Sequence, residues 1–271
     1  MEGGAAVGAV VVENPGPDNV RKKHVGGVKY EELTFDVGAE SKEILDWISS
    51  TWQGKGVRKN GSIQIADHNF NVVSERQFTD AIITGTTVSV LQPGGKDPLV
   101  FTVTIAPGQV QELAGSGKVP ASTLKAAKSL MSSNFRFEMG DLETAFVQRI
   151  EPFTVGQKVI EGQGGEERMP VKQPNTLEFS NLKITMAARP SPNWDRWREG
   201  FLIKGNGGEA QEKNGAIVFL DQTLTKELGR INLLNCGLIR LGSGRQETDK
   251  ESANTVTADL YCEKMELAIQ S

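Results

Sequence analysis

The sequence predicts a mainly β protein made of two tandem units, each a small β-barrel or sandwich with one inserted helix. The main observation is a repeat: residues 59–67 (KNGSIQIAD) return 154 residues later as residues 213–221 (KNGAIVFLD). Each copy places an Asn-Gly step, which favours the φ > 0 conformations of tight turns, before an apolar run that suits a strand. Each ends on an Asp that can start the next turn. The offset is too long for a solenoid period and fits one small domain.

The repeat extends on both sides of this segment. Upstream, residues 30–37 align with residues 179–186, with apolar residues at the same four places, and a Trp-centred segment follows each. Downstream, residues 75–81 align with residues 230–236. The offset grows from 149 to 155 and never resets, as loop insertions in one of two homologous units would leave it. The alternative is convergent strand–helix–strand patterning, which has no reason to keep one order across four segments.

In the first unit, residues 1–107, the elements follow from periodicity and from breakers. We expect strands at 9–13, 28–37, 62–66, 71–81, 87–91 and 99–105. A helix is expected at 41–52, with Ser41 as its cap, an apolar face that includes Ile48 and Trp52, and glycines after its end. The prolines of residues 14–18 predict a loop, and the basic patch of Arg21, Lys22 and Lys23 follows in it.

Residues 108–133 differ from both flanks, and we interpret them as a linker with a short helix at 120–131. The second unit, residues 134–271, opens with a strand at 134–139 for which the first unit has no counterpart. Further strands are expected at 144–160 with a break at Pro152, up to Met186, and at 216–220, 227–241 and 255–269, with a helix at 194–201. The loop that corresponds to the basic one is acidic here, with Glu166 and Glu167 beside Arg168.

Composition narrows the function classes. The net charge of −4 and the pI of about 5.5 argue against a nucleic-acid binder, which needs a basic face. The start lacks a basic signal sequence, and the apolar residues 9–12 are too few to span a bilayer. We therefore expect synthesis in a cytoplasm and no membrane insertion by this chain. Cys236 and Cys262 lie in predicted strands, and we expect them to be small buried hydrophobic residues. The alternative that they face each other on neighbouring strands stays open.

The sequence has few residues in patterns typical of catalytic sites. The two histidines, His24 and His68, fall in separate predicted loops, so no Ser–His–Asp or Cys–His arrangement is expected. Zinc-ligand spacings are absent, and the GSGK of residues 115–118 lacks the Ser or Thr of a phosphate loop. The sequence therefore predicts no enzyme and no catalytic, cofactor-binding or metal residues. The four tryptophans at helical spacing are expected to be core anchors, and the alternative is a stacking platform.

The order of these segments resembles one protein family. Residues 134–139 (NFRFEM), 151–155 (EPFTV) and 177–184 (LEFSNLKI), then the Trp helix, residues 213–221 and residues 233–236 are similar in order to the tail-tube proteins of contractile-tailed phages and contractile injection systems. The first unit carries the same order in residues 29–35, 46–48, the Asn60 segment and residues 78–81.

The resemblance implies a structural subunit of a tail tube in a virion tail or injection-system particle. Six such domains would form a ring with joined sheets, and stacked rings would form a conduit for DNA or protein cargo. The expected partners are further copies of the chain, a surrounding sheath, a baseplate hub and a tail terminator. The loops at 14–28 and 162–173 would couple successive rings, with Arg21, Lys22, Lys23, Glu166, Glu167 and Arg168 as candidate contacts.

Two departures leave alternatives open. A chain with two units could form a hexamer per ring or a pseudo-hexameric trimer, and the trimer is the arrangement of a tube-proximal baseplate hub or adaptor. The first unit also lacks the opening strand of the second. A different class, a two-domain β-barrel binding module for a peptide or sugar, would show an exposed aromatic patch on one unit.

Overall fold

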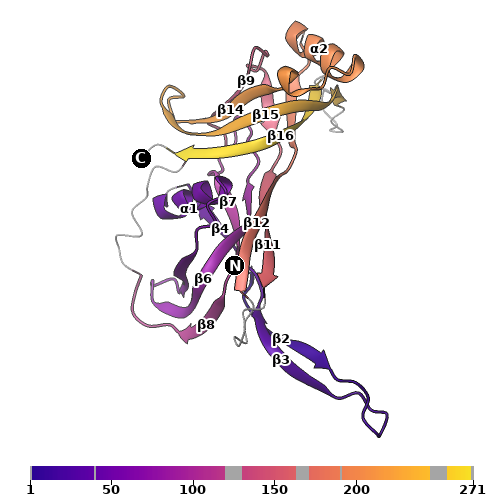
Figure 1. Cartoon of the computed structure of the whole chain (residues 1–271). Coiled ribbons are helices and arrows are strands. Elements are labelled where there is room, and N and C mark those ends of the chain that lie inside the picture. The colour runs from indigo at the N-terminus through magenta and orange to yellow at the C-terminus, as the bar shows by residue number, and fades with distance from the viewer. Residues whose placement is uncertain are drawn as a thin grey trace.

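The protein is mainly β, as the sequence predicts. The computed structural model describes residues 2–39, 41–119, 130–162, 171–189, 191–244 and 255–269. Within these ranges the strands form an eight-stranded sheet, a six-stranded sheet and a separate two-stranded hairpin (Figure 1). Neighbouring strands pair in the antiparallel sense, so one face of each sheet can pack on the core while the other meets solvent.

The eight-stranded sheet has the order β1-β4-β7-β6-β11-β12, and β5 and β8 pair with the other part of the long β6. Its strands are β1 (Glu2–Gly3), β4 (Leu33–Gly38), β5 (Lys59–Ala66), β6 (Val72–Val88), β7 (Val100–Ala106), β8 (Gln109–Ala114), β11 (Phe153–Gly162) and β12 (Val171–Phe179). The last two come from the second half of the chain, so sheet pairing crosses the predicted linker. The division into residues 1–107, 108–133 and 134–271 stays a prediction.

The six-stranded sheet has the order β10-β13-β16-β15-β14-β9. Its strands are β9 (Phe135–Met139), β10 (Val147–Ile150), β13 (Leu182–Ala187), β14 (Lys213–Leu220), β15 (Glu227–Gly244) and β16 (Thr255–Ile269). The separate hairpin consists of β2 (Ala6–Val12) and β3 (Lys23–Tyr30). In Figure 1 this hairpin projects from the body, on the side away from the six-stranded sheet.

The helices are α1 (Lys42–Trp52) and α2 (Pro192–Arg198), and α2 continues as a π-helical turn at Glu199–Ile203. Trp47, Trp52, Trp194 and Trp197 are each at most 6% exposed, which confirms them as core anchors. The indole N–H of Trp47 donates to the Val57 carbonyl at 2.8 Å, and that of Trp197 donates to the Gln211 carbonyl at 3.1 Å. These bonds tie each helix to the loop before β5 or β14. The Ser41 side chain makes no capping bond, contrary to expectation.

Four element predictions need correction. The predicted loop 14–28 ends before Lys23, because β3 begins there and pairs with β2. The predicted strand 28–37 is two strands, because the Glu31 N–H donates to the Ala5 carbonyl at 2.9 Å and closes the hairpin before β4 begins. The predicted strands 71–81 and 87–91 are the single strand β6, which continues through a β-bulge between Ile83 and Gly85. The predicted linker contains β8, which pairs with β6 along its whole length, from Gln109 to Ala114. The linker helix at 120–131 lies almost wholly outside the described residues.

Candidate functional site: an assembly surface

The two halves place corresponding residues in the same pairings. Gly61 of β5 faces Phe78 of β6, and Gly215 of β14 faces Leu233 of β15. Further along, β6 and β7 shift register between Ile83 and Gly85, and β15 and β16 shift register 155 residues later, between Leu238 and Arg240. The aligned sequence segments therefore occupy matching places in the two sheets.

The repeated Asn-Gly step stabilises a β-bulge. The Asn60 Oδ1 accepts the Asp80 backbone N–H at 2.8 Å, and the Asn214 Oδ1 accepts that of Asn235 at 2.9 Å. Asp80 and Asn235 have φ of 52° and 50°, left-handed values that interrupt the ladder of β6 and of β15. The predicted tight turn is thus wrong. The Asn-Gly step lies inside β5 and β14, and its side chain supplies the acceptor that the interrupted ladder lacks.

The Asp at the end of each repeat starts a turn, as predicted. The Asp67 Oδ1 accepts the backbone N–H of Asn71 at 2.9 Å, and the Asp221 Oδ1 accepts that of Thr225 at 3.0 Å. Hydrogen bonds from the Asn71 side chain and backbone hold the pKa of Asp67 below its usual value. The Thr223 hydroxyl and then backbone N–H groups lower the pKa of Asp221 in the same way.

The two hairpins also correspond, but their surroundings differ. Ala6 faces Tyr30 in β2–β3, and Val155 faces Phe179 in β11–β12, at an offset of 149 residues. The β11–β12 hairpin joins the eight-stranded sheet through the pairing of β11 with β6. Among the described strands, β2 and β3 pair only with each other.

The projecting hairpin carries an apolar surface. Val10 is 61% exposed and Val25 is 64% exposed. Four more of its valines are exposed, namely Val7, Val11, Val12 and Val28. Several exposed apolar side chains on one projecting element are typical of a protein contact.

The docked hairpin contacts the first half of the chain through residues of β12. Pro174 packs on the loop after α1, where a Cβ added to Gly56 would lie 2.7 Å from the Pro174 Cγ. The Arg58 guanidinium donates to the Lys172 carbonyl, and the Lys172 ammonium donates to the Pro107 carbonyl at 3.0 Å. Burial lowers the pKa of Lys172.

Sheet edges without a described partner form the second part of the surface. β14 pairs with β15 on one side and β9 on the other, whereas β5 pairs with β6 alone. The end of β15 from Gly237 to Gly244 pairs with β16 on one side, and no strand within the described ranges covers its other side. Such edges present free N–H and C=O groups that a strand of another chain can satisfy.

The predicted inter-ring residues are only partly placed. Arg21 and Lys22 are exposed between β2 and β3, and the exposed Lys23 begins β3. Glu166, Glu167 and Arg168 lie outside the described residues. The pairing of the basic loop with the acidic loop therefore stays a prediction.

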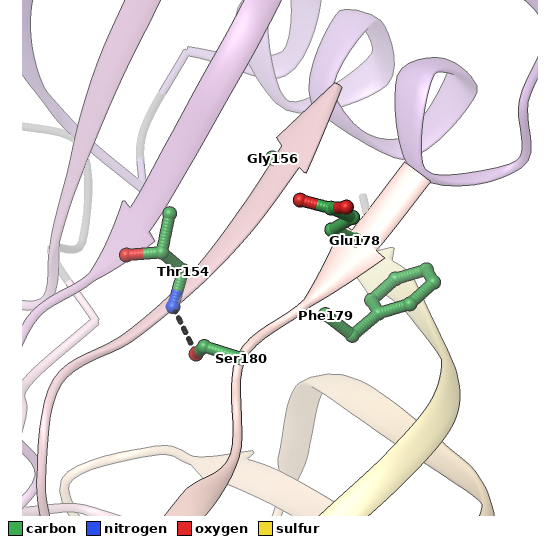
Figure 2. Close-up of a pocket in the computed structure, with 5 residues that line it drawn as sticks. All are labelled: Thr154, Gly156, Glu178, Phe179 and Ser180. Carbon is green, nitrogen blue, oxygen red and sulfur yellow. Dashed lines mark hydrogen bonds between the residues drawn. The ribbon is translucent and has the colours of Figure 1, made fainter. Parts of the chain in front are cut away.

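A surface hollow of about 520 Å³ lies on the β11–β12 hairpin (Figure 2). It is lined by Thr154, Gly156, Glu178, Phe179 and Ser180, and the Thr154 N–H donates to the Ser180 Oγ at 2.8 Å. The one carboxylate of this lining, Glu178, forms an ion pair with Lys158. The lining offers neither a nucleophile–base pair nor a metal-binding set of side chains.

A second hollow of about 410 Å³ lies at the bases of the two hairpins. Its lining includes Tyr30, Glu32, Glu161 and the buried Lys172. Glu161 forms an ion pair with Lys29 of β3, which links the base of the projecting hairpin to the docked one.

The described cysteines and histidines lie in three separate places. Cys236 and Cys262 face each other on β15 and β16 with their sulfurs 2.9 Å apart, and the hydrogen bond with Cys236 together with burial raises the pKa of Cys262. His24 lies beside Glu13 on the projecting hairpin, and His68 lies in the turn between β5 and β6. The described part of the chain holds no group of three or more His, Cys, Asp or Glu residues that could bind a metal ion. It also holds no helix long and apolar enough to cross a membrane.

Comparison with known proteins found no matching family model and no matching curated protein in sequence. Several solved structures are similar to about half of the chain. One is the PVC sheath-tube complex in its extended state, at 14% identity and a TM-score of 0.42, covering 56% of this chain and 100% of that one. Two others are the anti-feeding prophage tube-terminating cap (21%, TM-score 0.41, 50% and 89%) and the sixfold-symmetrised anti-feeding prophage baseplate (17%, TM-score 0.40, 49% and 91%).

Proposed function

We propose that this chain is a tandem duplication of one tube-like β unit and serves as a structural subunit of a tail tube in a contractile phage tail or phage-like injection system. Its copies assemble into rings, and the rings stack into a conduit for DNA or protein cargo. The sheath surrounds this conduit, and a baseplate hub and a tail terminator lie at its two ends. The chain carries out no catalysis.

One observation carries the proposal. The same hairpin occurs twice, once docked on a sheet edge as β11–β12 and once projecting with exposed valines as β2–β3. In a soluble monomer a projecting apolar hairpin and an open sheet edge would have no stabilising contact, and both promote association with other molecules. A subunit of an assembly uses both, because neighbouring molecules cover them.

The two-unit chain also favours a second candidate, a tube-proximal baseplate hub or adaptor. Three copies would supply six similar units around one axis, so a trimer could meet a sixfold tube on one side and a threefold structure on the other. Six chains per ring would instead support the tube subunit.

Electron microscopy of the purified chain at increasing concentration tests the proposal, first alone and then with the other particle components. We expect rings with a central channel, and the rotational symmetry of the ring separates three chains from six. Particles that stay monomeric at every concentration and beside every particle component would contradict self-assembly.

A further inference from the structure

We propose that the β2–β3 hairpin of one chain docks on the open edge of β15 in a second copy of this chain, in the register that β11 and β6 already show within the chain. This pairing of β2 with β15 between two chains is the joint. The inference rests on the proposed self-assembly and deepens it, because it names the residues of the joint.

The template for the joint lies inside the chain. Thr154 of β11 faces Thr87 of β6 with the two hydroxyl oxygens 2.8 Å apart, and the same short ladder runs from Phe153 opposite Val88 to Gly156 opposite Gly85. The hairpin of the second half therefore completes the sheet of the first half.

Among the described residues, the second half shows no corresponding addition to its sheet. β15 matches β6 in its pairing and in the position of its bulge, and residues 240–243 of β15 match residues 85–88 of β6. On β6 these residues pair with β7 and with β11. On β15 they pair with β16, and no described strand lies on the opposite edge.

The two offsets fix the expected register. Because β2 matches β11 and β15 matches β6, Ala5 of one chain faces Gly242 of the next, and Ala6 faces Leu241. Gly4 opposite Ser243 and Val7 opposite Arg240 complete a ladder of the same length as the template.

Burial at matched positions supports the same joint. Ala6 and Gly8 are exposed on the projecting hairpin, whereas their counterparts Val155 and Gln157 are 3% and 6% exposed on the docked one. Lys23 is likewise exposed, whereas its counterpart Lys172 is 9% exposed. The positions that docking buries in β11–β12 are thus the positions that β2–β3 leaves open.

The joint runs in one direction, from the first unit of one chain to the second unit of the next. Such a heterologous contact repeats until it closes into a ring or continues as a helix. Each chain then contributes one internal joint and one joint between chains, and both joints have the same strand pairing.

Disulfide trapping tests the register. The variant Ala5→Cys/Gly242→Cys places the two cysteines opposite each other across the proposed joint. Both sites tolerate the change, because Ala5 is exposed and a Cβ added to Gly242 would lie 3.8 Å from the Arg240 Nε, its nearest neighbour atom outside the adjacent residues. The matched control Ala5→Cys/Arg240→Cys shifts one partner by two residues, about 7 Å along the strand, which exceeds disulfide reach. The variant Thr87→Cys/Thr154→Cys reports the internal template and should link within one chain.

Under mild oxidation we expect Ala5→Cys/Gly242→Cys to give covalent dimers and longer chains at least tenfold above the shifted control. Thr87→Cys/Thr154→Cys should stay at the size of one chain. If rings form but the shifted control links equally well, or neither variant links, the register is wrong while the proposed function stands. If the wild-type chain never associates, both proposals fail. Should Gly242→Cys prevent folding, Ala6→Cys/Leu241→Cys tests the same ladder one residue along.

Discussion

A charge introduced at Ala6 should abolish assembly without harming the fold. Ala6 is exposed on β2, so the variant Ala6→Glu places its carboxylate in water in the isolated chain. In the docked hairpin the matching residue, Val155, is only 3% exposed. Docking would therefore desolvate the introduced carboxylate of the Ala6→Glu variant at a position without a partner for its charge.

The expected magnitude follows from that burial. Desolvating an unpaired charge costs several kcal/mol in a protein, and even about 3 kcal/mol weakens association more than about a hundredfold. The loss applies at every joint between chains, so rings should disappear at concentrations where the wild-type chain forms them.

The chain offers a matched control on the same strand. Val11 is 43% exposed, and its counterpart Ile160 remains 55% exposed although its hairpin is docked. Val11→Glu adds the same charge to the same strand at a site that docking leaves in water, so its association should stay within a few-fold of wild type. Sedimentation velocity over a concentration series measures association, and circular dichroism with thermal melting checks the fold. Equal association of Ala6→Glu and the wild type, or equal damage by both variants, would refute the reasoning.

Three further predictions concern the fold. Asn214→Ala and Asn60→Ala should each lower the free energy of unfolding in urea by about 1 kcal/mol, because each removes the acceptor that stabilises a bulge, whereas Asn214→Asp keeps that acceptor oxygen and should lose less; no loss in either alanine variant would argue against the bulge role. Because the folded pKa values of Asp67 and Asp221 lie below their unfolded values, their contribution to stability is present above the unfolded pKa of about 3.9 and is lost as the pH falls through the folded pKa. Thermal melts from pH 6 to pH 2 should show this decline, and Asp221→Asn should flatten part of it; an unchanged slope would contradict the assignment. Cys262 should resist thiol reagents in the native protein and react only after denaturation, since a buried thiol with a raised pKa forms little thiolate; rapid native labelling would be inconsistent with this.

The sequence predicted much of the local structure because side-chain patterning records local structure directly. The alternating run after Asn60 and the continuous apolar run after Asn214 marked β5 and β14. The spacing of the tryptophans marked α1 and α2, and the Asp at the end of each repeat marked a turn.

Other features depended on groups that leave little trace in a sequence. The Asn-Gly step looked like a tight turn, because its role depends on a left-handed residue about 20 positions later on another strand. β6 looked like two strands, since a bulge and a glycine interrupt its alternation without ending it. β8 looked like part of a linker, because Gly115 and Gly117 follow it closely and hide a short edge strand.

The sequence by itself determined that the chain is a β protein with a pattern that occurs twice, and it identified the buried tryptophans. Only the tertiary structure decided that one copy of the hairpin docks on the opposite half of the chain while the other projects. The physical reason is that strands join through backbone hydrogen bonds, which are the same for nearly every residue type. Two similar hairpins can therefore pair with different strands or with none. The path of the whole chain sets which sheet edge each hairpin reaches.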